Sequence, residues 1–454
     1  MIQAGLQLEE LPEKEQWSLD IEKVSLMCNV ISEISTDVLP TKRQLLTTLL
    51  LQNNPIKKIS VSFLTNMPCL SVLNLSATKI ESLPNSISEL KNLTTLLLWG
   101  CYELRDLPCL SMLQQLKKLD LRWTKIEEVP EGMDMLIKLR YIDLQVRTLK
   151  EIPAGTLPKL VHLQHLSFDV NNEKTSLKVE EMEPLKKLEC FTRRFEDISE
   201  LNKFISSMQQ SKKNLIKYYL RVGSYIGGCG RDKTLTIGGV DNWEGIECVV
   251  SLSSFASSSA HPFQSLQVLD LQVLPKLSAL IMKDAGIGSA TTSILAPSTT
   301  FSHLKKISIS KCSSTSEVER NWSDALIKFH LPKLRVLTLW RLPNLKSICS
   351  KSGVMVCDFL QLISVMSGCD KLKRIPPFVP FVGNEQPFAY APPSLTIESS
   401  TKWWEWLEWD DHPNFKNVLL PLWKDESYMF DVVEEKDKSV GGKEVGGRIV
   451  QKRG

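Results

Sequence analysis

The chain has 454 residues, of which 55 are basic and 52 acidic, so its formal net charge is only +3. This balance excludes recognition of nucleic acid or of an anionic membrane through net charge alone. The sequence contains no run of 18 or more apolar residues, the length that a membrane-spanning helix needs.

The cysteines and the first residues bear on the cellular compartment. Eleven cysteines lie far apart without a Cys-x-x-Cys pair, which favours free thiols in a reducing environment. The first ten residues have neither the basic nor the apolar region of a secretory signal. We therefore expect a cytoplasmic protein, with peripheral association at the inner face of the plasma membrane left open.

The N-terminal part of the chain leads into a repeat. Residues 1–15 are polar and contain proline, and they predict the remnant of an interdomain linker. A degenerate first repeat follows at Ile21-Glu-Lys-Val24-Ser-Leu26, with Asn29 in the position that ends the phrase. Regular repeats continue to residue 170, so 16–170 is predicted to form the N-terminal leucine-rich repeats.

The phrase Leu-x-x-Leu-x-Leu recurs every 23 or 24 residues in this block. All three of its slots are apolar in six consecutive copies, which begin at Leu46, Leu70, Leu93, Leu116, Leu139 and Leu163. A fixed period of this length indicates stacked repeats, and the phrase is that of a leucine-rich repeat. We predict an α/β leucine-rich-repeat solenoid (horseshoe), with a parallel sheet on the concave face. Short helices, 3-10 turns and loops are expected on the convex side.

Another position recurs eight residues after the first leucine of each phrase. Small side chains that can form hydrogen bonds stand there, at Asn54, Thr78, Cys101 and Thr124. They predict a ladder that satisfies the buried backbone polar groups of the turn.

The period fails between residues 171 and 265. Leu185-Lys-Lys-Leu188-Glu-Cys190 echoes the phrase, and residues 198–208 have the apolar spacing of a helix. Two stretches rich in glycine and serine, 223–230 and 251–259, predict a loop insertion. We expect irregular repeats over 171–265.

Repeats resume in the C-terminal part of the chain. New phrases begin at Leu266, Leu304, Leu334 and Leu360, and a tryptophan cluster at 403–409 precedes a further apolar run. We predict C-terminal repeats and a tryptophan-rich cap over 266–425, because the last repeat needs its open core covered. Residues 426–454 are charged and poor in apolar side chains, which predicts a disordered tail.

Motifs for catalysis or metal binding are weak. Residues 227–234 resemble a phosphate-binding loop, but Asp232 replaces the second glycine, and its carboxylate would repel the phosphates. His162 and His165 have no third ligand at zinc-like spacing. No histidine can be paired from sequence with a serine or cysteine nucleophile. We expect neither enzymatic activity, nor a metal, nor a cofactor in this chain.

The best candidate for a functional site is a strip of residues that face the concave side of the strands. They stand between and just after the core leucines, and they include the residue types that dominate interface hot spots. The predicted protein-binding strip consists of Leu97, Trp99, Lys118, Asp120, Arg122, Trp123, Arg140, Tyr141, Asp143, Gln145, His165 and Asp169. The alternative is that any solenoid surface exposes some aromatic and charged side chains.

The ends of the repeat region resemble a known family. Gln3-Ala-Gly-Leu-Gln-Leu8 near the start and Trp403-Trp-Glu-Trp-Leu-Glu-Trp-Asp410 near the end are similar to plant intracellular disease-resistance proteins. The class is the one with a coiled coil, a nucleotide-binding domain and leucine-rich repeats, and the resemblance covers roughly residues 1–425. The chain lacks the coiled-coil and nucleotide-binding domains, so any ADP or ATP site would belong to those domains.

The resemblance implies a role in plant defence and innate immunity. Repeats of that class recognise pathogen effectors or guarded host proteins, and they restrain the nucleotide-binding switch domain of the same full-length protein. The expected partners are therefore proteins, and no nucleic acid. The chain would then be a truncated receptor; the alternative is a stand-alone scaffold or decoy that binds a protein partner without signalling.

Overall fold

The computed structural model describes most of the chain in two compact units. The described residues are 1–34, 45–168, 179–195, 197–210, 215–223, 233–238, 248–251, 265–272, 279–282, 303–311, 328–343, 345, 348, 354–380, 390–409 and 413–425. Unit 1 comprises Met1–Ile237 with Ala260–Pro262, and unit 2 comprises Gly238–Ser259 with Phe263–Gly454. Each unit is described by itself.

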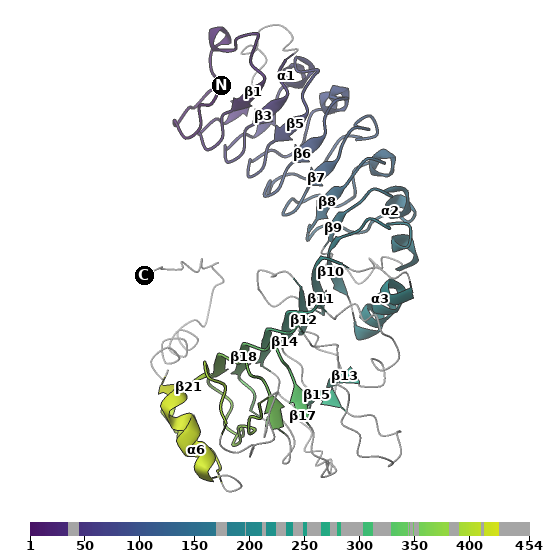
Figure 1. Cartoon of the computed structure of the whole chain (residues 1–454). Coiled ribbons are helices and arrows are strands. Elements are labelled where there is room, and N and C mark those ends of the chain that lie inside the picture. Colours follow the sequence, from purple (N-terminus) through teal and green to yellow (C-terminus); the bar gives the residue numbers. More distant parts are fainter. Residues whose placement is uncertain are drawn as a thin grey trace, which may run out of the picture. The chain divides into compact units, whose positions relative to one another are not determined.

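Unit 1 is built on short parallel strands that pair in chain order (Figure 1). These strands are β1 (Lys23–Ser25), β3 (Thr48–Leu50), β5 (Val72–Asn74), β6 (Thr95–Leu97), β7 (Lys118–Asp120), β8 (Tyr141–Leu144), β9 (His165–Phe168), β10 (Cys190–Phe195), β11 (Lys217–Val222) and β12 (Thr234–Gly238). A separate parallel pair joins β2 (Glu33–Ile34) to β4 (Lys58–Ile59). The predicted parallel-sheet solenoid is confirmed.

Short helices precede β1 or occupy the stretches between these strands. They are the 3-10 helices η1 (Lys14–Gln16), η3 (Asn85–Glu89), η4 (Met133–Met135) and η5 (Val179–Met182), and the α-helices α1 (Val61–Thr65), α2 (Thr156–Lys159) and α3 (Ile198–Gln210). In Figure 1 the strands line one side of unit 1, and α1, α2 and α3 lie on the other.

The repeated leucines form the core of unit 1. The middle slots are direct register partners on neighbouring strands, as Leu96, Leu119 and Ile142 show. Each of these three side chains is 0% exposed. Burial of one such side chain stabilises the fold by roughly 1.5–3 kcal/mol, so the period in the sequence is a packing period.

The predicted ladder of hydrogen bonds is present beside this core. Asn54 donates from Nδ2 to the Leu51 carbonyl at 2.9 Å and to the Leu26 carbonyl of the preceding repeat at 2.8 Å. The Oγ1 of Thr78 donates to the Leu75 carbonyl at 2.8 Å, and Cys101 Sγ donates to the same oxygen at 3.1 Å. Each side chain satisfies backbone carbonyls that the sharp turn leaves buried.

The phrase assigned to Leu185-Lys-Lys-Leu188-Glu-Cys190 is wrong by three residues. Cys190 and Phe191 are the register partners of His165 and Leu166, so Leu188 takes the first slot and Phe191 the second. The third slot holds Arg193, which pairs with Phe168 in register and is 1% exposed. A charged residue in an apolar slot hid the correct register from the sequence pattern.

Helix α3 supplies contacts that offset the cost of burying the charge of Arg193. Arg193 forms an ion pair with Glu200 of α3, and its guanidinium carbon lies 4.7 Å from the centre of the Phe195 ring. Phe204 of α3 stacks on Phe191, with ring centres 5.0 Å apart. The helix predicted over 198–208 is confirmed, and it covers this repeat.

Unit 2 repeats the same design. Parallel strands pair in the order β14 (Val268–Gln272), β16 (Lys306–Ser310), β18 (Val336–Trp340), β20 (Leu362–Val365), β21 (Thr396–Ser399) and β22 (Trp423–Asp425). Two further parallel pairs are β13 (Cys248–Ser251) with β15 (Ala279–Met282), and β17 (Lys328–His330) with β19 (Val354–Val356). The phrases that begin at Leu266, Leu304, Leu334 and Leu360 lead into β14, β16, β18 and β20.

The tryptophan cluster lies at the last strands of unit 2, around α5 (Thr401–Glu405), α6 (Pro413–Leu419) and η8 (Leu420–Leu422). Trp403 is 6% exposed and donates from Nε1 to the Leu372 carbonyl at 2.9 Å. Trp404 stacks on Trp423 of β22 with ring centres 5.3 Å apart. This packing is the kind that the predicted cap requires.

Several predictions fall on residues outside the described ranges. They concern Asp169, residues 227–232 of the motif that resembles a phosphate-binding loop, most of the predicted loop insertion, and the tail over 426–454. In the part of the chain that is described, no helix combines the length and apolar character needed to cross a membrane.

Candidate functional site

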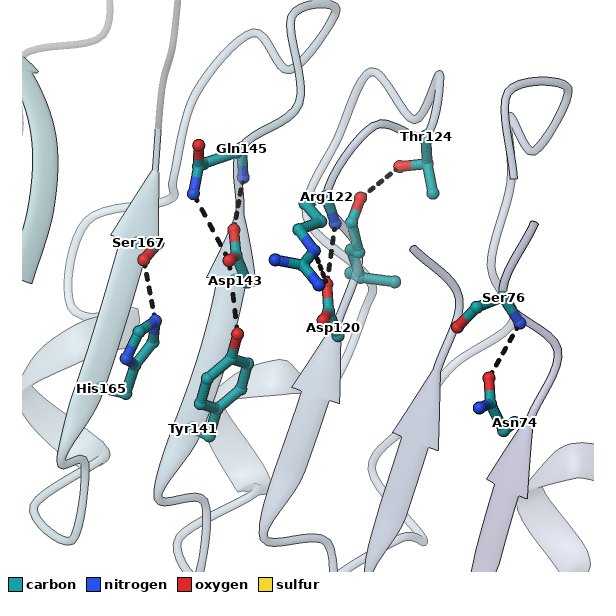
Figure 2. Close-up of polar contacts among 11 residues, drawn as sticks. Asn74, Ser76, Asp120, Arg122, Thr124, Tyr141, Asp143, Gln145, His165 and Ser167 are labelled. Carbon is teal, nitrogen blue, oxygen red and sulfur yellow. Dashed lines mark hydrogen bonds and ion pairs between the residues drawn. The ribbon is translucent and has the colours of Figure 1, made fainter. Parts of the chain in front are cut away.

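Parallel pairing in unit 1 brings residues of the predicted strip together in rows. Lys118, Tyr141 and His165 are register partners on β7, β8 and β9. The next row, two residues further along each strand, contains Asp120, Asp143 and Ser167 (Figure 2). Side chains two residues apart on a strand point to the same face, so the two rows share one surface.

An aromatic cluster forms where β6 and β7 end. The rings of Trp99 and Trp123 meet edge to face, with centres 6.2 Å apart and planes at 78°. The guanidinium carbon of Arg122 lies 5.5 Å from the Trp99 ring centre and 5.8 Å from that of Trp123. Trp123 is 50% exposed. The cluster therefore presents a large aromatic surface with a cation beside it, the combination found in interface hot spots.

Trp123 occupies a backbone position that is left-handed in the neighbouring repeats as well. Its φ is +61°, and the equivalent position holds Gly100 with φ +73° one repeat earlier and Ala77 with φ +55° two repeats earlier. The left-handed conformation lets the Trp123 N–H donate to the Gln145 carbonyl of the next repeat at 3.0 Å. A residue with a Cβ pays roughly 1–2 kcal/mol for this conformation. The same conformation recurs at Cys28 and Asn53, so the turn of the repeat requires it, and at Trp123 the turn carries an exposed indole.

The carboxyl groups of the strip lie beneath this surface. Asp120 and Asp143 are each 2% exposed, although the sequence pattern placed them on the open face. Asp120 Oδ1 accepts a hydrogen bond from Arg122 N at 3.3 Å, and Asp143 Oδ1 accepts one from Gln145 N at 3.1 Å. Figure 2 shows the same arrangement at Asn74 and Ser76. The recurring side-chain turn closes the strand end, and it explains why short polar residues stand at this position.

Burial changes the proton affinity of both acids. Burial raises the pKa of Asp120 above its usual range, and the Arg122 guanidinium partly offsets this. Burial, reinforced by the charge of Asp120, raises the pKa of Asp143 to about 7. Tyr141 donates from its hydroxyl to Asp143 Oδ2 at 3.4 Å, which favours the ionised carboxylate.

The row above the acids is a stack of rings. Tyr141 and His165 are parallel, with ring centres 4.1 Å apart, and Lys118 Nζ lies 4.5 Å from the Tyr141 ring centre. Burial and the neighbouring charges of Lys118 and Arg122 lower the pKa of His165 to about 4. The imidazole is therefore neutral at physiological pH, and it acts as a flat ring rather than a charge.

One hydrogen bond at the site has the geometry of a nucleophile and its base. Ser167 Oγ lies 2.9 Å from His165 Nε2. Ser167 is only 1% exposed, however, and a histidine with so low a pKa is a weak general base at neutral pH. Within the described ranges, no cluster of three or more histidine, cysteine or acidic residues could hold a metal ion. The arrangement suits binding.

The other residues of the predicted strip occupy its margins. Leu97 and Gln145 are half-buried, and Arg140 is exposed. Sequence reasoning missed one exposed cation of the same face, Lys217. Lys217 lies on β11 as the register partner of Cys190. The phrase Leu215-Ile-Lys-Tyr218-Tyr-Leu220 could have revealed it, but this repeat begins outside the 23- or 24-residue period.

Comparisons with known proteins support the assignment of leucine-rich repeats. A family model described as leucine rich repeat matches residues 44–102. Disease resistance protein At4g27190 of Arabidopsis thaliana is 27% identical, over 93% of this chain and 49% of the relative. Disease resistance protein UNI of the same plant is 28% identical, over 94% of this chain and 43% of the relative. The chain spans about half the length of these curated relatives.

Further matches are shorter or more distant. Disease resistance protein RFL1 of Arabidopsis thaliana is 36% identical over 37% of this chain and 19% of the relative. A solved leucine-rich-repeat protein of Leptospira interrogans is 17% identical, with a TM-score of 0.49 and coverage of 93% of this chain and 94% of that one.

Proposed function

We propose that this chain, a leucine-rich-repeat protein with homologues among plant disease resistance proteins, binds a protein partner in plant defence. The binding surface is the strip on the strand face of unit 1. The proposal places the chain inside the plant cell and makes it a recognition module rather than an enzyme.

One observation carries this proposal, the cluster of Trp99, Arg122 and Trp123. Monomeric proteins bury large aromatic side chains, because each ring gains several kcal/mol by leaving water. Here one indole is half exposed, sits at a left-handed backbone position, and lies next to a second indole and a guanidinium. The favourable use of such a surface is contact with a partner that covers it.

The finer role follows from the relatives. A recognition surface on the repeats would sense a pathogen effector or a guarded host protein. In a full-length relative, the same repeats would restrain the nucleotide-binding domain by favouring its resting state over its active state. A partner that prefers one state would shift this equilibrium, and no chemistry in the repeats would be needed.

The test is affinity capture with the full chain as bait. Three versions are compared on plant leaf extract: wild type, Trp99→Ala with Trp123→Ala, and Tyr102→Ala. Tyr102 is an aromatic residue of the same unit that is 60% exposed and lies outside the strip, so its variant is the matched control. Captured proteins are quantified by mass spectrometry, and each candidate is then measured as a purified protein against the three baits.

We expect at least one protein to bind wild type and the Tyr102 variant equally, and the double variant at least ~100-fold more weakly. Two hot-spot tryptophans lost together correspond to about 3 kcal/mol or more. Circular dichroism and thermal melting confirm that each bait is folded. The proposal fails if every partner that binds directly is retained by the folded double variant.

A further inference from the structure

The acidic and the basic side chains of the strip differ in how deeply they are buried. The side chain of Arg122 is 36% exposed, whereas that of Asp120, its ion-pair partner, is 4% exposed. Asp143 is as deeply buried, under Tyr141 and Gln145. The acids thus lie below the surface, and the cations lie on it.

More exposed cations lie next to this centre, at the starts of neighbouring strands. Lys117 and Arg140 lie side by side on neighbouring repeats, where Arg140 N donates to the Lys117 carbonyl at 2.8 Å. Lys217 is exposed on β11. Glu189, on the repeat between Arg140 and Lys217, is an exposed acid at the margin. A partner that approaches the centre of the strip therefore meets predominantly positive charge.

The buried acids do not cancel this charge fully. Each carboxylate already accepts hydrogen bonds from within the strip, from Arg122 or from Gln145 and Tyr141. A cationic partner would have to displace Arg122 or Tyr141 to reach them. Burial also raises the pKa of Asp143 to about 7, so this carboxyl group carries only part of a negative charge near neutral pH.

The two innermost cations belong to the same repeat. Lys118 begins β7 and Arg122 lies in the turn that follows it, so their backbone positions are at most roughly 13 Å apart, the span of a fully extended chain. Each is held against rings, Lys118 over Tyr141 and Arg122 beside Trp99 and Trp123. This fixes two positive charges with an aromatic surface next to them, and it reduces the entropy lost when they bind.

We propose that the strip binds an acidic, extended segment of a protein partner. Two of its carboxylates contact Lys118 and Arg122, and an apolar side chain of the same segment covers the exposed edge of Trp123. The matching pattern is a pair of acidic residues about four positions apart with an apolar residue beside the second. This inference rests on the proposed function, because it names the chemistry of the partner at the same surface.

The experiment is peptide display on the full chain, with a library of random 12-residue peptides as the probe. Selections use wild type, Lys118→Gln with Arg122→Gln, Trp99→Ala with Trp123→Ala, and a control with Lys125→Gln and Lys138→Gln. The control removes two exposed cations from the same repeats outside the strip. Glutamine keeps much of the side-chain length and removes the charge without adding repulsion near Asp120. Enriched peptides are then synthesised and measured by fluorescence anisotropy at low and high salt.

We expect wild type to enrich peptides rich in aspartate and glutamate that also carry an apolar residue. Their affinity should fall about tenfold or more in the Lys118 and Arg122 variant, fall in the tryptophan variant, weaken with salt, and persist in the control.

Neutral or basic peptides that bind wild type and are lost in the tryptophan variant would overturn this inference and leave the proposed function standing. Peptides that bind wild type and the two strip variants with equal affinity would count against both the inference and the proposed function. A selection that enriches no peptide would also count against both. If no peptide is selected and the chain instead binds vesicles containing phosphatidylserine through Lys118 and Arg122, the surface recognises a membrane and the inference is wrong.

Discussion

Units 1 and 2 each place a tryptophan against a cation at the end of a strand, but in opposite order. In unit 1, Arg122 comes first and Trp123 takes the left-handed position. In unit 2, Trp340 comes first and Arg341 takes the left-handed position with φ +50°. The guanidinium of Arg341 lies 5.1 Å from the Trp340 ring centre, close to the distances found in unit 1. The backbone geometry of the repeat thus creates the pair, whichever residue comes first.

The strand-face acids of the two units differ more than the clusters do. In unit 1, Asp143 lies next to Asp120 in register, so two buried carboxyl groups face each other across neighbouring strands. In unit 2, Asp270 accepts a hydrogen bond from Gln272 Nε2 at 2.7 Å, but its register partner on β16 is Ser308. Unit 1 therefore concentrates charge where unit 2 does not, and this distinguishes the candidate binding surface from a repeat that uses the same turn.

The largest expected effect comes from substitutions in the leucine cores of the two units, and it shows whether the two cores are equally well packed. Leu119 of unit 1 is 0% exposed and Leu337 of unit 2 is 2% exposed. Replacement of either by alanine should lower the free energy of unfolding by about 3–5 kcal/mol, since loss of a buried leucine side chain leaves a cavity. Urea unfolding gives the loss, and hydrogen exchange with mass spectrometry shows which unit opens. Met112→Ala is the surface control, and a loss below ~1 kcal/mol at Leu337 would show a looser core in unit 2.

The next effect concerns pH and the paired acids. The pKa of Asp143 is raised to about 7 in the folded chain, above the 3.8 of a solvated aspartate. The folded state therefore holds a proton that the unfolded state loses, and stability present below pH ~4 is lost as the pH rises to ~7. Asp143→Asn avoids this loss, so its stability relative to wild type should improve by on the order of 2–4 kcal/mol between pH 4 and pH 8.

Asp270→Asn is the matched variant of unit 2 for this comparison. Burial raises the pKa of Asp270 without a second acid, so its pH effect should have the same sign and be smaller. His165 has the opposite slope, because its lowered pKa costs stability as the pH falls from ~6.5 to ~4, so differences between variants are measured rather than absolute curves. A stability difference between Asp143→Asn and wild type that does not change with pH would contradict the prediction.

The smallest effect separates backbone strain from side-chain contacts. At Trp123, glycine should be more stable than alanine by about 1 kcal/mol, because both lose the ring and only alanine keeps the left-handed strain. Arg341 should show the same order in unit 2. Thermal melting of the four variants measures the differences. At Arg122, whose φ is not positive, alanine should be the more stable of the two, and the same order at Trp123 would remove the argument for strain there.

Much of unit 1 could be predicted because one physical rule governs it. A buried slot every 23 or 24 residues requires an apolar side chain, so the leucines predicted the register, and Asn54 and Thr78 predicted the ladder beside it. The aromatic and cationic members of the strip followed from alternation along each strand. These features depend on a residue and its own repeat, which the sequence displays directly.

The remaining features depend on neighbours that the sequence does not place. Arg193 fills an apolar slot only because Glu200 of α3 reaches it, so the pattern around it was read three residues out of register. The burial of Asp120 and Asp143 follows from the covering rings and turns of adjacent repeats. The left-handed backbone of Trp123 could have been inferred from Gly100 at the equivalent position, but a single glycine is a weak signal.

The ladder of Asn54 and its counterparts also determines how the solenoid comes apart. Asn54 bonds at once to Leu51 of its own repeat and to Leu26 of the one before, and Cys101 likewise donates to the carbonyl of Leu75 in the preceding repeat. Unfolding is therefore coupled from one repeat to the next. It starts most readily at a terminal repeat, which has a neighbour on one side only.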